Sequence, residues 1–214
     1  MAKRKKAPKK KKTAKKKKTT KKATKKTTKK ATKKTNKKAA KKSAKKPKSA
    51  VAMKLGPVSA PQVQVGGVVP EFEAPATGMQ SVKLSDFRGK KLVLFFYPKD
   101  STPGCTIEGH DFSNLKGGFE IKNVVVYGVS RDSLTSHENF KSKQSYTVDL
   151  ISDSDEKLCR IFGTIKNKNM YGKIVQGLDR STFVIDEEGR LIKEWRGVKV
   201  EGHAQEVLDY INSL

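Results

Sequence analysis

The sequence predicts an α/β fold in which a central mixed sheet is flanked by helices and preceded by a disordered basic tail. Apolar, strand-like runs alternate with helix-like segments from residue 92 onward. Charge divides the chain, because residues 1–70 contain 28 Lys and Arg without an acid, whereas the remainder holds 20 basic and 21 acidic residues. Residues 68–214 are enough for one domain with a sizeable core.

The first 50 residues are predicted to be a disordered lysine-rich tail. Between Lys21 and Lys46 lysine pairs recur every four residues, and no aromatic residue occurs before Val51. Nothing there can build a core, and like charges four residues apart oppose a helix. Residues 51–67 contain three glycines and two prolines and are predicted to be a linker, which leaves 68–214 as the folded domain.

Apolar runs predict the strands. The first run, residues 92–97, is almost continuously apolar, which is typical of a strand buried on both faces. Residues 186–189, Asp-Glu-Glu-Gly, separate the last two runs and are a hairpin signal. The predicted strands are Leu92–Tyr97, Val124–Val129, Leu150–Ile151, Thr182–Ile185 and Leu191–Trp195.

Helices are predicted between these strands and at the end of the chain. Ser133 and Asp153 are candidate N-caps for two of them, because short polar side chains accept hydrogen bonds from first-turn N–H groups. The predicted helices run from Thr106 to about Lys116, near Thr135–Gln144, over a short segment with Leu158, Ile161 and Phe162, and over the segment that carries Val207, Leu208 and Ile211.

A cysteine stands where the first strand passes into the first helix. The run Pro98–Cys105 follows the strand, and Thr106 opens the predicted helix. Free backbone N–H groups and the positive end of the helix dipole would face the sulfur. A thiol there should ionise more readily than a free one, and the thiolate is the nucleophilic form. We interpret Cys105 as a reactive cysteine, the alternative being a buried small apolar residue.

The residues around this cysteine resemble a known family. Pro98, Thr102 and Cys105 fit the Pro-x-x-x-Thr-x-x-Cys signature of peroxiredoxins, and residues 96–109 look like the bacterioferritin-comigratory, or Q-type, subgroup. Further blocks match in order at residues 129–133, 167–173 and 180–186, so the resemblance spans roughly Val69 to Leu214. It implies a thioredoxin-like fold and a thiol-dependent peroxidase that needs no cofactor.

The resemblance also assigns roles to individual residues. Cys105 would attack the peroxide and become a sulfenic acid. The Thr102 hydroxyl would bond the thiolate and the peroxide, and Pro98 would end the strand and shield the thiolate from water. Arg180 would lie against the sulfur, hold it ionised and stabilise charge in the transition state.

The second cysteine is a candidate resolving residue. Cys159 lies among core-type residues, so packing is the interpretation we favour. In relatives the resolving cysteine stands five residues after the reactive one or after an Asn-Phe pair, and these positions hold His110 and Lys141 here. An external thiol must therefore restore Cys105, directly or through a disulfide with Cys159. Thioredoxin, glutaredoxin or a low-molecular-weight thiol are the expected reductants.

The basic tail suggests a nucleic-acid partner. It resembles the lysine-rich tails of linker histones and would bind phosphates without reading sequence. The representative lysines are Lys21, Lys22, Lys25, Lys26, Lys29 and Lys30. The alternatives are a purely solubilising appendage, or a histone-like, DNA-coating protein whose peroxiredoxin-like domain is secondary or inactive.

Composition excludes several other classes. No run of eighteen apolar residues occurs, which disfavours a membrane span, and no hydrophobic stretch behind the basic start suggests a secretory signal. The three histidines show no metal-ligand spacing, so no metal site is expected. We expect an intracellular, cytoplasmic protein, associated with a nucleoid or nucleus if the tail binds DNA, and a monomer or weak dimer.

Overall fold

The computed structural model of the chain describes residues 60–170 and 173–214. The predicted tail at 1–50, with its lysines, and residues 51–59 of the predicted linker lie outside these ranges. The remaining linker residues belong to the folded domain. The Gln62 N–H donates to the carbonyl of Ile161 over 2.8 Å, the Gly66 N–H donates to that of Leu191 over 2.7 Å, and the Val63 side chain is buried.

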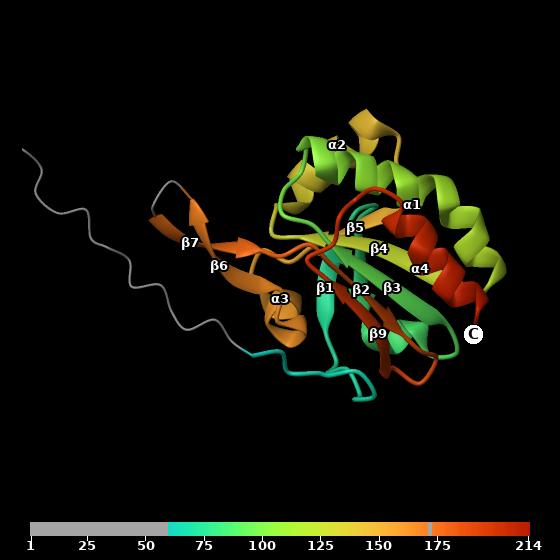
Figure 1. Ribbon diagram of the computed structural model, residues 1–214. Helices are drawn as coiled ribbons and strands as arrows, with labels where there is room; N and C mark the ends of the chain where they lie inside the picture. The colour runs from blue at the N-terminus through green and yellow to red at the C-terminus, as the bar shows by residue number, and fades with distance from the viewer. Residues whose placement is uncertain (1–59, 171–172) are drawn as a thin grey trace, which may run out of the picture. The chain divides into compact units, whose positions relative to one another are not determined.

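A seven-stranded sheet forms the centre of the domain (Figure 1). Its strand order is β2-β1-β5-β4-β3-β8-β9. β3 pairs in parallel with β4, and β4 with β5, while the other neighbours are antiparallel, so the predicted mixed sheet is confirmed. The strands are β1 Glu73–Ala76, β2 Gln80–Lys83, β3 Lys91–Phe96, β4 Val124–Ser130, β5 Asp149–Ser152, β8 Ser181–Ile185 and β9 Leu191–Arg196.

The predicted helices are present, but the first is longer at both ends than predicted, and the N-cap of the short third helix is Glu156 in place of the predicted Asp153. The first begins at Pro103, three residues earlier than predicted, because Thr102 is its N-cap and proline suits the first helical position. Ser133 caps the second as predicted, accepting from the Ser136 N–H. None of the helices in the described ranges could span a membrane. The bounds are α1 Pro103–Ile121, α2 Leu134–Gln144, α3 Lys157–Phe162 and α4 His203–Asn212, with a 3-10 turn at Leu84–Phe87.

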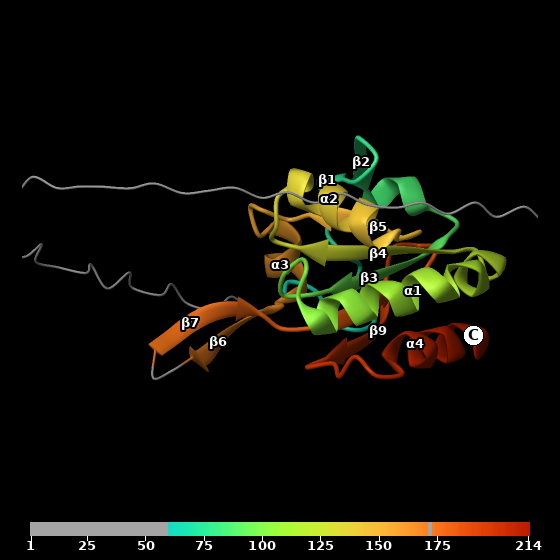
Figure 2. The same cartoon turned by 90° about the horizontal axis from the view of Figure 1, so that it is seen from above.

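The sheet separates two apolar cores. Along β3, alternate side chains point to opposite faces, so that Leu94 belongs to one core and Phe95 to the other. Residues of α1, α2 and α4 fill the core on one side, and α1 and α4 lie side by side there (Figures 1 and 2). Residues of α3 belong to the core on the other side.

A two-stranded hairpin was not predicted. Strands β6 (Ile165–Met170) and β7 (Lys173–Leu178) pair only with each other and extend away from the main sheet in both views (Figures 1 and 2). Lys166 and Lys168 form ion pairs with Asp179 at the base of the hairpin. The segment carries little apolar alternation, and only its base, with Ile165 and Leu178, packs against the core among the described residues.

Candidate active site

Cys105 lies in the first turn of α1. Thr102 is the N-cap and Pro103 and Gly104 precede the cysteine, so its thiol sits at the positive end of a 19-residue helix. The side chain is buried, with 2% of its surface exposed. Farther along α1, a Cβ on Gly109 would stand 2.6 Å from the ring of Tyr146, whose hydroxyl donates to the Thr106 carbonyl over 2.9 Å. This contact holds the first turns of α1 against the segment after α2.

Arg180 lies against the sulfur. Its Nη2 stands 3.3 Å from the Cys105 Sγ, although the two residues are 75 positions apart. The register of the sheet explains this meeting, because β8 pairs with β3 so that Ser181 stands opposite Phe96. Arg180, just before β8, is thereby placed beside the loop that leads from β3 into α1. Nearby charges raise the pKa of its guanidinium although burial, the largest influence, lowers it.

Glu108 is a third member of the site that the sequence analysis did not predict. It stands three residues after Cys105 on α1, is buried, and one of its carboxylate oxygens accepts from Nη1 of Arg180. Burial, the largest influence, raises the pKa of this carboxyl to about 7, while the charge of Arg180 lowers it. Its Oε1 has no hydrogen-bond partner in residues 60–170 and 173–214. The sequence signal that could have indicated Glu108 is an acidic residue three positions after the cysteine on the same helix.

Thr102 has a hydrogen-bond partner other than the expected one, whereas Pro98 stands at the end of the strand as expected. The Thr102 hydroxyl donates to the Lys99 carbonyl over 3.0 Å, so here it bonds its own loop and not the sulfur. Pro98 is exposed and follows β3 by two residues, which fits the end of a strand. Ser101 between them has a φ of 59°, a left-handed conformation that a non-glycine residue rarely adopts.

Cys159 lies on the opposite side of the sheet from Cys105. Its fully buried side chain on α3 belongs to one core, while Cys105 belongs to the other. Burial, the largest influence, raises the pKa of the Cys159 thiol well above its usual range, and the Asp153 carboxylate raises it further. That carboxylate accepts from the N–H groups of Leu158 and Cys159, which fixes the start of α3. These surroundings favour packing over redox chemistry.

The two usual resolving positions hold other side chains with contacts of their own. The His110 Nε2 lies 3.2 Å from the Gln144 side-chain oxygen. Lys141, in the last turn of α2, donates to Asp149 of β5. Neither side chain can form a disulfide with Cys105.

An open groove includes Gly104, the residue before Cys105. Its volume is about 510 Å³, and its lining includes Gly104, Ile107, Val198 and Val200. A Cβ on Gly104 would lie 3.5 Å from Nη2 of Arg180 and 3.7 Å from Val200, so the groove ends next to the Cys105 site. The groove therefore combines three apolar side chains with the charged Lys199 and Glu201, and it reaches the residue just before Cys105.

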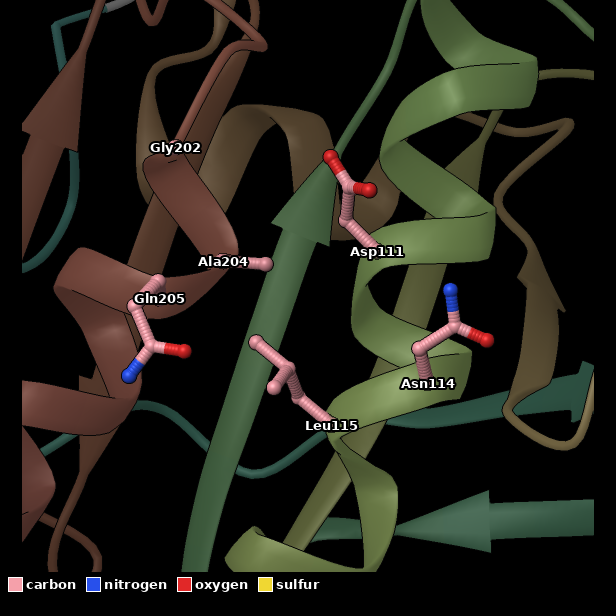
Figure 3. A pocket seen from close by; sticks show the side chains of 6 residues that line it. All are labelled: Asp111, Asn114, Leu115, Gly202, Ala204 and Gln205. Atoms are coloured by element: carbon pink, nitrogen blue, oxygen red, sulfur yellow. The ribbon is translucent and has the colours of Figure 1, made fainter.

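A second pocket lies between α1 and α4. Its volume is about 270 Å³, and Figure 3 shows Leu115 of α1 pointing toward α4, which carries Ala204 and Gln205. Cys105 and Arg180 are not among its lining residues.

The fold and site together define a class of protein. A buried thiol at a helix N-terminus, with a guanidinium against it, on a thioredoxin-like sheet is the arrangement of a thiol-dependent peroxidase. A profile of the AhpC/TSA family matches residues 65–194. "Peroxiredoxin Bcp" of Xanthomonas campestris pv. campestris is 51% identical over 139 residues, which cover 64% of this chain and 87% of the relative. "Peroxiredoxin Bcp" of Bacillus subtilis is 44% identical over 152 residues, covering 71% and 97%.

Solved structures show the same likeness. The bacterioferritin comigratory protein of Xanthomonas campestris, described for its alkyl peroxide reduction activity, has a TM-score of 0.64 at 48% identity, covering 66% of this chain and 90% of its own. A cysteine variant of PrxQ from Xylella fastidiosa has a TM-score of 0.69 at 43% identity, covering 72% and 98%. The chain belongs to the AhpC/TSA family as a peroxiredoxin of the Bcp, or Q, type, and it is a thiol-dependent peroxidase.

Proposed function

We propose that Cys105 is the nucleophile of this peroxidase. Its thiolate attacks the terminal oxygen of a hydroperoxide, the O–O bond breaks, and the sulfur becomes a sulfenic acid. The departing alkoxide or hydroxide takes a proton and leaves as alcohol or water. The observation that carries the proposal is the 3.3 Å approach of Arg180 Nη2 to the Cys105 Sγ.

Arg180 and Glu108 act as a pair in this proposal. One guanidinium nitrogen stabilises the thiolate and then the negative charge on the departing oxygen. The other is held by the buried Glu108 carboxylate, which fixes the guanidinium plane. Thr102, in the loop between β3 and α1, orients the peroxide. Its hydroxyl turns from the Lys99 carbonyl toward the bound oxygen. Pro98 closes the strand before this loop.

Alkyl hydroperoxides are proposed as substrates beside hydrogen peroxide. The groove at Gly104 has apolar walls from Ile107, Val198 and Val200, which suit an alkyl group whose hydroperoxide end reaches Cys105. The alkyl peroxide reduction ascribed to the Xanthomonas campestris relative supports this choice. Hydrogen peroxide needs none of these contacts.

The reductant is proposed to be an external thiol. One thiol condenses with the sulfenic acid to give a mixed disulfide and water, and a second thiol then releases Cys105 and leaves as a disulfide. Thioredoxin, glutaredoxin or a low-molecular-weight thiol can supply these groups. Because Cys159 lies across the sheet, a bond between the two cysteines would need extensive local unfolding.

Mass spectrometry of the full chain after one equivalent of cumene hydroperoxide tests the proposed chemistry. Trapping with dimedone should place a single adduct on Cys105. Catalytic consumption of the peroxide should then depend on added thiol. A labelled Cys159, or consumption without labelling of Cys105, would refute the assignment.

Changing Cys159 to serine should retain most of the turnover with a small-molecule thiol. The thiol is buried away from the groove and its raised pKa keeps it protonated, so it supplies no step of the cycle. Steady-state rates of the variant and wild type, with dithiothreitol and with thioredoxin, measure this. A quantitative loss of two hydrogens on oxidation of the wild type, together with loss of thioredoxin-supported activity in the variant, would instead identify an atypical two-cysteine enzyme.

The tail is proposed to hold the enzyme on nucleic acid. Its lysine pairs, which lie outside the described residues, offer positive charge without any side chain able to read bases. A nucleoid or nuclear location would follow, with the peroxidase placed near DNA.

Binding of duplex DNA by the full chain should show little sequence preference and weaken steeply with salt. Each neutralised phosphate releases counterions, so the logarithm of the binding constant should fall linearly with the logarithm of the salt concentration. The matched control is a shortened protein beginning at Ala60, which keeps the buried Val63. Fluorescence anisotropy with labelled DNA measures both. Equal binding by the shortened protein, or an affinity independent of salt, would contradict the proposal.

A further inference from the structure

A buried polar cluster stands behind the loop that carries Cys105. The Asp100 carboxylate accepts from the Tyr97 hydroxyl over 2.8 Å, from the Ser136 hydroxyl over 2.6 Å, and lies 3.0 Å from the His137 Nδ1. The Asp100 N–H donates to the Asp132 carboxylate over 2.7 Å. Asp100 is 7% exposed and His137 fully buried. The N–H and both carboxylate oxygens of Asp100 therefore have partners that fix its place.

This cluster joins two parts of the chain. Asp100 belongs to the loop between β3 and α1, five residues before Cys105, whereas Ser136 and His137 lie in the first turn of α2. A nitrogen of His137 that faces a carboxylate carries a hydrogen and donates it. The contact thus ties the cysteine loop to α2 through a charge-assisted hydrogen bond.

Helix α2 also has contacts with parts of the domain other than this loop. Lys141 contacts Asp149 of β5, and the Gly78 N–H donates to the Glu138 carboxylate over 2.6 Å. The helix is therefore a fixed support for the loop. The left-handed Ser101, next to Asp100, is the kind of backbone conformation that persists only where the surroundings determine it.

Asp100 is charged in the folded protein. Burial, the largest influence, raises its pKa, but hydrogen bonds from His137 and Ser136 and the nearby charge of His137 together hold the pKa below its usual range. A buried carboxylate that loses these donors would be driven to move or to take up a proton. Either change would act on the loop that ends at Thr102 and Cys105.

We propose that Asp100 and His137 form a positioning pair, which holds the first turn of α1 so that Cys105 meets the guanidinium of Arg180. The inference rests on Cys105 as the proposed nucleophile. Neither residue touches the substrate. Their effect reaches the reaction through the position of the loop, and a displacement of the thiol by about 1 Å is enough to lower a rate by up to about 10²-fold.

The test compares three variants with a matched control. Asp100→Asn keeps the shape but removes the charge, and His137→Leu removes the donor. His137→Asn returns an amide N–H at the place of Nδ1 and is the rescue variant. Asp149→Asn is the control, because it weakens a contact of α2 with β5 that involves neither Asp100 nor His137.

Two rates and one stability are measured on the full chain. These are the second-order rate of Cys105 oxidation by hydrogen peroxide, the rate of Cys105 alkylation by iodoacetamide at neutral pH, and the melting temperature. Asp100→Asn and His137→Leu should lower both rates by about 10-fold or more, while His137→Asn should recover most of each. Asp149→Asn should lower the melting temperature and leave both rates unchanged.

A purely structural role predicts a different pattern. Rates that stay at the wild-type value well below the melting temperature in Asp100→Asn and His137→Leu would overturn the proposal, as would failure of His137→Asn to rescue. If Asp100→Asn does not fold, the two His137 variants decide. If the wild type is not oxidised at Cys105, the proposed function fails, whereas the alkylation rates still report on positioning.

Discussion

Changing Cys105 to serine is expected to reduce peroxide turnover to the rate without enzyme, a loss of at least about 10³-fold. A serine hydroxyl is barely ionised at neutral pH, and oxygen cannot become the sulfenic acid on which the cycle depends. The fold should persist. The replacement is nearly the same size, and its hydroxyl can accept the hydrogen bond that Arg180 now directs at the sulfur over 3.3 Å.

The second cysteine of the chain offers a matched control for this variant. Cys159→Ser makes the same atomic change in the core on the opposite face of the sheet. Coupled peroxide assays and circular dichroism on both variants separate loss of chemistry from loss of fold. Substantial turnover by Cys105→Ser in a folded protein would remove Cys105 from the mechanism, whatever the result for Cys159.

Local sequence signals were sufficient for the central strands. β3, β4 and β8 are buried almost along their whole length, so they appear as apolar runs, and Asp186 and Gly189 mark the turn from β8 to β9. β1 was missed for a physical reason, because Pro75 interrupts its pattern. The strand tolerates this proline, since its register with β5 covers only the pair Ala76 and Ile151.

The site was predictable only in part from local signals. Cys105 could be singled out because a strand, a proline and a helix start surround it. The contact with Arg180 depends on the register of β8 on β3, which no short-range pattern reveals, so only the family resemblance suggested it. Glu108 was missed because a single acid in a helix is usually solvated. Its burial follows from packing that forms only when the sheet and α1 come together.

The second large effect is expected from Arg180→Met, which should slow the oxidation of Cys105 by about 10²-fold. Methionine keeps much of the bulk but removes the fixed charge that we propose stabilises the thiolate and the departing oxygen. The variant should still fold. Arg180 lowers the pKa of Glu108, so without it burial raises that pKa further and the carboxyl becomes neutral instead of leaving a buried, unpaired charge.

Two companion variants show which property of Arg180 matters. Arg160→Met removes an exposed arginine that pairs only with Glu156 among the contacts of the described residues, and it should leave the rate unchanged. Glu108→Gln keeps Arg180 charged but weakens its anchor, so its loss should be smaller than that of Arg180→Met. Stopped-flow oxidation of Cys105 by hydrogen peroxide measures all three. An unchanged rate in Arg180→Met would show that the guanidinium beside the sulfur has no part in the reaction, and a larger loss in Glu108→Gln would assign the carboxyl a role beyond holding Arg180.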